Sequence, residues 1–264
     1  MQPSVSSYPR IIRAIMLREL LSRYTGDKVG YAWSLLIPLM WVVLIWVFFL
    51  IFSRPLPLDT DVGSFILTGL VPYISFRYTL SAVMRSKLTY HNLFIIPRVT
   101  PEIVCFAVGL LEIANAFVIY GVLMLGNWFL FGHLEIANPL MIASGLLLAC
   151  ILGTSFAYMT VSIITNVRFA LRAMQIAVRP MFYLSGVFFI ISELPHGLQE
   201  VMWFNPLVHA IEITRTGAFG DFSSRTVAAW WPLFCSAGFV VVGSFASQRG
   251  GIWGEDDSGG ELPI

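Results

Sequence analysis

Three long stretches without a charged residue constrain this chain more than any other feature. They cover residues 29–53, 136–167 and 226–248. A helix that crosses the hydrocarbon core of a bilayer needs about 20 mostly apolar residues, so each stretch is long enough to span a membrane. The composition agrees: 57% of the residues are hydrophobic and 12% charged, against about 45–50% and about 25% in soluble domains. We therefore expect an all-α integral membrane protein.

Three further apolar stretches are interrupted by charge. They are residues 62–84, 103–131 and 174–192, which contain Arg77, Glu112 and Arg179 respectively. Counting them gives six transmembrane helices, so both termini should lie on the same side. The segments on that side, residues 1–28, 77–102, 166–179 and 248–264, hold 13 of the 16 Lys and Arg residues. Because basic residues accumulate in cytoplasmic segments, we expect both termini in the cytoplasm.

This topology divides the chain into three parts. Residues 1–28 are expected to form a cytoplasmic N-terminal interfacial helix, residues 29–248 the six-span domain, and residues 249–264 a cytoplasmic tail. The N-terminal helix either lies among lipid headgroups only or also contacts a cytoplasmic partner. Residues 193–225 are too apolar for a solvated loop and too interrupted to span, which predicts a re-entrant external hairpin of short helices before the last span.

The predicted hairpin carries one polar face. Asn205, His209 and Glu212 recur at helical spacing after Pro206, a residue suited to the first turn of a helix. Arg215 follows Glu212 by three residues, which allows an ion pair. This face either ties the hairpin down or faces the exit of a transport pathway.

Charges at membrane depth require a partner or a water-filled cavity. Arg77 and Arg179 either extend toward cytoplasmic headgroups or line a route for an anionic cargo. Glu112 either bonds to a neighbouring helix or contacts substrate.

Small residues recur every four positions within residues 136–167. They are Gly145, Ala149, Gly153 and Ala157. Such a stripe lets helices approach closely, either within one subunit or between two copies.

No catalytic or metal-binding pattern is found. The four histidines, His91, His133, His196 and His209, lack metal-ligand spacing. Neither lysine lies in a phosphate-binding G-x4-G-K-[ST] loop, so no ATP site is expected in this chain. The formal net charge of +1 gives no basis for nucleic-acid binding.

Several short motifs resemble those of ABC transporter permeases that export bacterial polysaccharides. They are Arg18-Glu19, Arg23-Tyr24, Gly30-Tyr31, Trp33, Pro38, residues 67–72 (LTGLVP), Asn92-Leu93-Phe94, Pro97, Pro180, Tyr183, Gly186, and residues 205–209 (NPLVH) with Glu212 and Arg215. Their order is preserved from about Leu17 to Arg215. The likeness is strongest to the capsular polysaccharide exporter, whose cargo carries an acidic Kdo linker on a phospholipid.

The resemblance implies partners and residue roles. Two copies of the chain would line one path across the bacterial inner membrane, and two ATP-binding cassette subunits, which bind ATP and Mg²⁺, would dock from the cytoplasm. A periplasmic adaptor and an outer-membrane export protein would carry the lipid-linked acidic polysaccharide onward. The residues expected to couple to the ATPase are Arg18, Arg23, Arg85, Lys87, Leu93, Phe94 and Arg98. Those expected along the substrate pathway are Tyr31, Trp33, Arg77, Arg179, Phe204, Asn205, His209, Glu212 and Arg215.

Other functions stay open at this stage. Within the same class, the cargo of a teichoic acid, O-antigen or drug exporter is an alternative. A secondary transporter would show inverted repeats with paired broken helices, and no clear halves are found. A membrane glycan enzyme would need paired carboxylates at the external face, for which Glu193, Glu200 and Glu212 are the candidates.

Overall fold

The computed structural model describes residues 8–25, 30–51, 60–96, 99–164, 167–220, 222 and 227–250. Throughout these ranges the regular structure is helical. The elements are α1 (Tyr8–Thr25), α2 (Gly30–Ile51), α3 (Val62–Tyr90), the 3-10 turn η2 (His91–Ile95), α4 (Pro101–Phe131), α5 (Pro139–Ile163), α6 (Val167–Leu184), η3 (Ile191–Glu193), α7 (His196–Trp203), α8 (Pro206–Ala218) and α9 (Trp230–Gly250). The all-α fold expected from the sequence is confirmed for this part of the chain.

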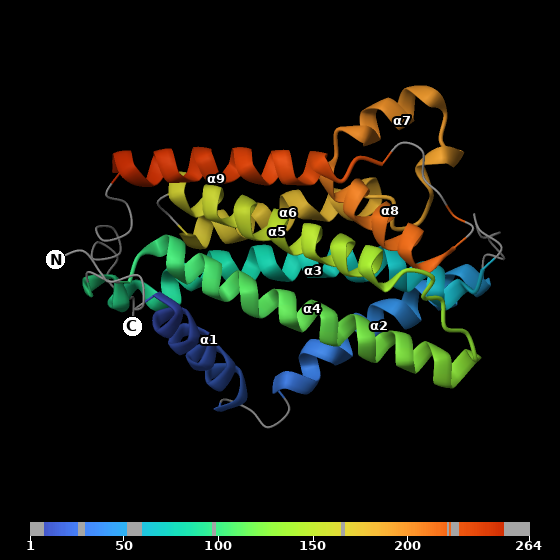
Figure 1. The fold of residues 1–264 in the computed structure, drawn as a ribbon, viewed down its shortest axis with the longest axis horizontal. Coiled ribbons are helices and arrows are strands. Elements are labelled where there is room, and N and C mark those ends of the chain that lie inside the picture. Colours follow the sequence, from blue (N-terminus) through green and yellow to red (C-terminus); the bar gives the residue numbers. More distant parts are fainter. Residues whose placement is uncertain are drawn as a thin grey trace.

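Helix α5 lies at the centre of the bundle and contacts α3, α4, α8 and α9 (Figure 1). Its small residues make this possible. A Cβ atom added at Gly145 would lie 2.2 Å from Oγ1 of Thr214 on α8, and one at Gly153 would lie 2.7 Å from the carbonyl oxygen of Phe76 on α3. Ala149 is fully buried. The stripe therefore packs α5 against two helices of the same subunit, the first of the two alternatives above.

The six predicted spans correspond to α2, α3, α4, α5, α6 and α9. Three of them are long and apolar enough to cross a membrane by length and composition: Pro101–Phe131, Pro139–Ile163 and Trp230–Gln248. In α2, a shorter apolar stretch covers Leu36–Phe49. The start of α1 and the end of α9 lie at the same end of the bundle, together with η2, whereas α7 lies at the other end (Figure 1).

The predicted bounds of the fifth span, residues 174–192, are wrong. Helix α6 begins at Val167 and ends at Leu184. It extends through Arg168 and Arg172 because both side chains are exposed while Val167 and Ala170 pack inward. It ends early because Gly186 adopts a left-handed backbone, with φ of 77°, and turns the chain away.

Short helices were predicted within residues 193–225, and the structure has two there, α7 and α8. They differ in their surroundings. No residue of α7 is buried, whereas α8 is buried on all sides except at Pro206 and Thr216. Asn205 caps α8 by accepting a hydrogen bond from the backbone N–H of Leu207 at 3.1 Å, and Pro206 occupies the first turn. Helix α8 therefore belongs to the core of the bundle, between α3 and α5.

Candidate functional site: an arginine pocket and two supporting clusters

A pocket of about 410 Å³ opens between α2, α3 and α6, and we call it the arginine pocket. Its lining residues are Trp41, Leu70, Tyr73, Ile74, Arg77, Arg179, Phe182 and Tyr183. Two residues predicted for the substrate pathway, Arg77 and Arg179, are thus brought together although they are about a hundred positions apart in the sequence. The pocket combines two guanidinium groups with four aromatic rings.

The aromatic rings of the pocket form one connected cluster. The ring centroid of Phe182 lies 5.0 Å from that of Tyr73 and 5.9 Å from that of Trp41. Its centroid is also 5.3 Å from that of Tyr183. Such separations are typical of favourable aromatic pairs. The Tyr73 hydroxyl donates a hydrogen bond to the carbonyl oxygen of Val178 at 3.1 Å, which fixes α6 next to α3 immediately before Arg179.

The two guanidinium groups have no hydrogen-bond acceptor within the part of the chain that the structure describes. Among the described residues, no hydrogen bond or ion pair is made by Arg77, which is half-buried, or by Arg179, which is exposed. A cation at membrane depth is costly unless an anion, a carbonyl group or water compensates it. The pocket can therefore bind an anionic group between the arginines while its rings contact apolar or C–H surfaces.

The two arginines were predicted as pathway residues from the sequence, whereas the aromatic residues that line the same pocket were not. The missing signal was helical spacing. Tyr73 precedes Arg77 by four residues, and Tyr183 follows Arg179 by four, so each pair shares one helix face. The meeting of these two faces depends on how α3 packs against α6, which no spacing within one helix specifies.

Arg215 of α8 is enclosed within the protein. Its Nη1 donates to the carbonyl oxygens of Gly186 at 2.6 Å and Phe189 at 2.7 Å, and its Nη2 donates to that of Val187 at 2.8 Å. The guanidinium carbon lies 4.2 Å from the ring centroid of Phe65, a cation–π contact. Arg215 therefore holds the irregular backbone that follows α6.

Gly69, in the LTGLVP motif of α3, leaves room for this arrangement. A Cβ atom at this position would lie 2.7 Å from Nη2 of Arg215 and 3.0 Å from the carbonyl oxygen of Val187. Any larger residue would displace the guanidinium group from the carbonyl groups that it binds. The motif glycine and the hairpin arginine, predicted separately, thus belong to one structural cluster.

The Glu212–Arg215 ion pair expected from the spacing is wrong: no ion pair joins the two residues, whose side chains are both described. Instead, Oε1 of Glu212 accepts a hydrogen bond from the backbone N–H of Ile191 at 3.2 Å. Both side chains are fully buried. The physical reason is that the chain after α6 supplies backbone donors and acceptors closer to each side chain than its neighbour on α8.

His209 and Asn205 also bind the backbone around the hairpin. Nε2 of His209 lies 2.8 Å from the carbonyl oxygen of Trp203, and Nδ1 accepts from the backbone N–H of Ala228 at 3.2 Å. These contacts assign a neutral ring with the proton on Nε2. Nδ2 of Asn205 donates to the carbonyl oxygen of Leu184 at 3.1 Å. The alternative in which this polar face ties the hairpin down accounts for all of these contacts.

The remaining residues predicted for the substrate pathway are more exposed or lie outside the described residues. Phe204 is 67% exposed, and its ring centroid lies 6.5 Å from that of Trp231. The side chains of Tyr31 and Trp33 lie outside the described residues. Asn115 of the same helix donates a hydrogen bond to the carboxylate of Glu112 at 3.4 Å, so both alternatives given for Glu112 stay predictions.

At the other end of the bundle, Tyr90 joins α1 to the end of α3. Its hydroxyl donates to Oε2 of Glu19 at 2.8 Å, and the guanidinium carbon of Arg18 lies 5.2 Å from its ring centroid. Tyr90 itself is buried and directly precedes η2, where Leu93 and Phe94 are half-buried. Arg18 is thus placed beside the turn that was predicted to couple to the ATPase.

Arg85 and Lys87 were predicted to share this role, but their surroundings differ. Arg85 is exposed. Lys87 is 7% exposed, and its ammonium group donates to the carbonyl oxygen of Val161 in the last turn of α5 at 3.2 Å. Because the last carbonyl groups of a helix lack partners within the helix, Lys87 caps α5 instead of presenting its charge at the surface. Arg98 and the side chain of Arg23 lie outside the described residues.

Comparison with known proteins places these features in a family. Residues 10–219 match the family described as ABC-2 type transporter. The chain is similar to capsule polysaccharide export inner-membrane protein CtrC of Neisseria meningitidis serogroup A, with 29% identity over 89% of this chain and 88% of that protein. It is also similar to polysialic acid transport protein KpsM of Escherichia coli (26% identity, 82% of this chain and 84% of that protein). A third relative, capsule polysaccharide export inner-membrane protein BexB of Haemophilus influenzae, is 26% identical over 92% of this chain and 89% of its own length.

These relatives agree with the prediction of a multi-pass inner-membrane protein, and the family resemblance seen in the motifs is confirmed. The match covers most of the chain, from α1 to the end of α8. The chain belongs to the ABC-2 type transporter family.

Proposed function

We propose that this chain is the transmembrane subunit of an ATP-driven exporter that moves lipid-linked capsular polysaccharide from the cytoplasm across the bacterial inner membrane. The observation that carries the proposal is the arginine pocket. Its two arginines, which have no acceptor among the described residues, suit the acidic linker of the cargo, and its aromatic rings suit sugar faces and lipid. The names of the relatives support the same cargo class.

The proposed topology has six spans, formed by α2, α3, α4, α5, α6 and α9, with both termini in the cytoplasm. Residues 1–28 then form the interfacial helix, residues 29–248 the permease domain with a re-entrant external hairpin at 193–225, and residues 249–264 the tail. The distribution of Lys and Arg supports this orientation. It places η2 and the Tyr90 contact with α1 at the cytoplasmic end, and α7 at the external end.

The proposed complex contains two copies of this chain and two ATP-binding cassette subunits that bind ATP and Mg²⁺. The chain itself is a transport subunit without an enzymatic role. Exposed Arg85, Arg18 and the turn η2 form the docking surface for the ATPase. A periplasmic adaptor and an outer-membrane export protein would receive the polysaccharide on the external side.

The experiment compares Arg77→Gln, Arg179→Gln and the double variant with the parent chain in cells that make capsule. A hydrogen bond to a charged group contributes about 1.5–3 kcal/mol, so each substitution should lower export roughly tenfold when binding limits transport. Surface polysaccharide is measured with a capsule-specific antibody, and cytoplasmic polysaccharide is measured after lysis. We expect surface loss together with cytoplasmic accumulation.

Arg168→Gln is the matched control, because Arg168 is an exposed arginine of the same helix that does not line the pocket. It should leave export unchanged. Normal surface polysaccharide in the double variant, at parental membrane levels of the protein, would overturn the assignment of the pocket to the cargo.

A further inference from the structure

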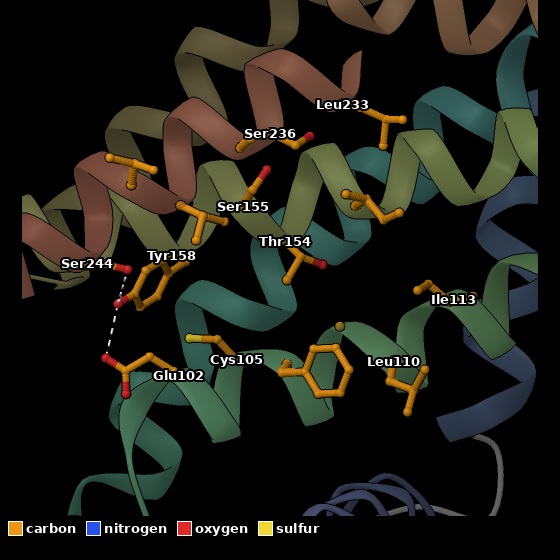
Figure 2. Close-up of a pocket in the computed structure, with 16 residues that line it drawn as sticks. Glu102, Cys105, Leu110, Ile113, Thr154, Ser155, Tyr158, Leu233, Ser236 and Ser244 are labelled. Atoms are coloured by element: carbon orange, nitrogen blue, oxygen red, sulfur yellow. Dashed lines mark hydrogen bonds between the residues drawn. The ribbon is translucent and has the colours of Figure 1, made fainter. Parts of the chain in front are cut away.

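A second, larger cavity lies on the surface of α5 where α4 and α9 flank it, and we call it the α4–α9 groove (Figure 2). Its volume is about 630 Å³. Its apolar walls include Phe106 and Leu110 from α4, Ile151 from α5, and Leu233, Val240 and Val241 from α9. It is lined by none of the residues of the arginine pocket, so it is a separate site.

One end of the groove is polar. Oε1 of Glu102 accepts a hydrogen bond from the Tyr158 hydroxyl at 3.0 Å, and the same hydroxyl lies 3.5 Å from Oγ of Ser244. Figure 2 shows these three side chains together at one end, with Ile113 and Leu233 toward the other. The polar end coincides with the end of the bundle that holds η2, which the proposed topology places at the cytoplasmic membrane surface.

Glu102 forms no ion pair with any described residue. A glutamate in the first turn of a helix is favoured by the helix dipole, which explains its presence in α4. The dipole does not explain why a tyrosine from α5 reaches this carboxylate at the mouth of a cavity, with its hydroxyl also beside Ser244 of α9. A carboxylate accepts several hydrogen bonds, and Tyr158 uses only one of these positions.

A buried polar atom also lines the groove. Oγ of Ser236 on α9 has no hydrogen-bond partner among the described residues, and the side chain is 4% exposed. Buried hydroxyl groups normally have a partner, because leaving one unpaired costs free energy.

A cavity of about 630 Å³ is the size of typical sites for small ligands. The groove has apolar walls and a carboxylate at one end, which fits one acyl chain and a cationic headgroup.

We propose that the α4–α9 groove binds a phospholipid with an ammonium headgroup, such as phosphatidylethanolamine. Its acyl chain lies along the apolar walls, its ammonium group donates hydrogen bonds to Glu102, and its phosphate accepts from the hydroxyl of Ser244. This lipid is distinct from the transported cargo, because the carboxylate of Glu102 repels an acidic linker whereas the arginine pocket attracts it.

The test measures lipid retention by the full-length chain, purified in detergent and analysed by native mass spectrometry. Vesicles of equal phosphatidylethanolamine and phosphatidylglycerol content supply the lipid before extraction. We expect the parent chain to retain phosphatidylethanolamine about tenfold over phosphatidylglycerol, the effect of one charge-assisted hydrogen bond. Glu102→Gln should abolish this preference, and the groove-filling variant Ala237→Phe should lower retention of both lipids.

Glu200→Gln is the matched control, because Glu200 is an exposed glutamate on α7, away from the groove. It should retain lipids as the parent does. An unchanged headgroup preference in Glu102→Gln, or unchanged retention in Ala237→Phe, would overturn the proposal. A photo-crosslinker at Val241 that labels a protein instead of lipid would also overturn it and assign the groove to a partner helix. None of these measurements depends on transport.

Discussion

Replacing Arg215 with methionine tests whether this arginine holds the irregular backbone between α6 and η3 in place. Methionine fills a similar length without charge, so the carbonyl groups of Gly186, Val187 and Phe189 lose the donors that bind them in the structure. The chain between α6 and η3 should then leave its position against α3 and α8. Arg215→Lys should recover only part of the loss, because an ammonium group lacks the planar fork that reaches several carbonyl groups at once.

The expected size follows from the number of bonds and their burial. Each hydrogen bond to a charged group contributes about 1.5–3 kcal/mol, and three are lost with the contact to Phe65. Removing a fully buried charge recovers part of this, because its desolvation cost disappears. Each carbonyl group left without a donor costs about 1–3 kcal/mol, so a net loss of about 3–5 kcal/mol is expected after the recovered desolvation cost. At about 2–4 °C per kcal/mol for a chain of this size, Tm should fall by roughly 6–20 °C.

Tm is measured by the fluorescence of the purified protein in detergent. Arg179→Met is the control, since that exposed arginine makes no described hydrogen bond, and its Tm should stay near the parental value. The exchange Glu212→Arg with Arg215→Glu should not restore stability, because the two residues do not form an ion pair. If Arg215→Met unfolds within about 2 °C of the parent, or if the exchange restores Tm, the account of Arg215 is refuted.

Two further predictions concern the end of the bundle that holds η2. Tyr90→Phe removes the hydroxyl that binds Glu19, so α1 should be held less firmly against the end of α3. We expect faster proteolysis at residues 8–25 and a free energy of unfolding lower by about 1 kcal/mol; equal cleavage of both chains would contradict the role of this contact. Arg85→Glu should weaken co-purification of the proposed ATPase without changing Tm, because Arg85 is exposed. Lys87→Met should lower Tm, because Lys87 is buried and caps α5. An unchanged Tm in Lys87→Met would show that this cap is dispensable.

The helical elements could be predicted from the sequence because they depend on local composition. The charge-free stretches indicated α2, α5 and α9, and the stripe at Gly145 and Gly153 indicated close packing of α5. The bounds of α6 could not be predicted from charge alone. An amphipathic helix keeps its arginines on the exposed side, so Arg168 and Arg172 do not interrupt it.

The hydrogen-bond partners of buried polar residues could not be predicted from the sequence, for a different reason. Spacing on α8 places Glu212 next to Arg215, but the irregular backbone at residues 185–191 offers each of them better partners. The path of such backbone is decided by tertiary packing. The same holds for Lys87, whose acceptor, the carbonyl oxygen of Val161, is 74 residues away in the sequence.

The burial of α8 has a consequence for the order of assembly. This helix is synthesised after α3, α4, α5 and α6, yet its residues fill the space beside Gly145 on α5 and Gly69 on α3. A nascent chain that has inserted only the earlier helices therefore leaves the backbone at these glycines uncovered. The carbonyl groups that Arg215 binds also lack a donor, and the bilayer holds no water to replace it. The bundle closes only after Ala218 has left the ribosome, so a chain truncated before Pro206 should fail to form a stable bundle even though α2 to α6 are complete.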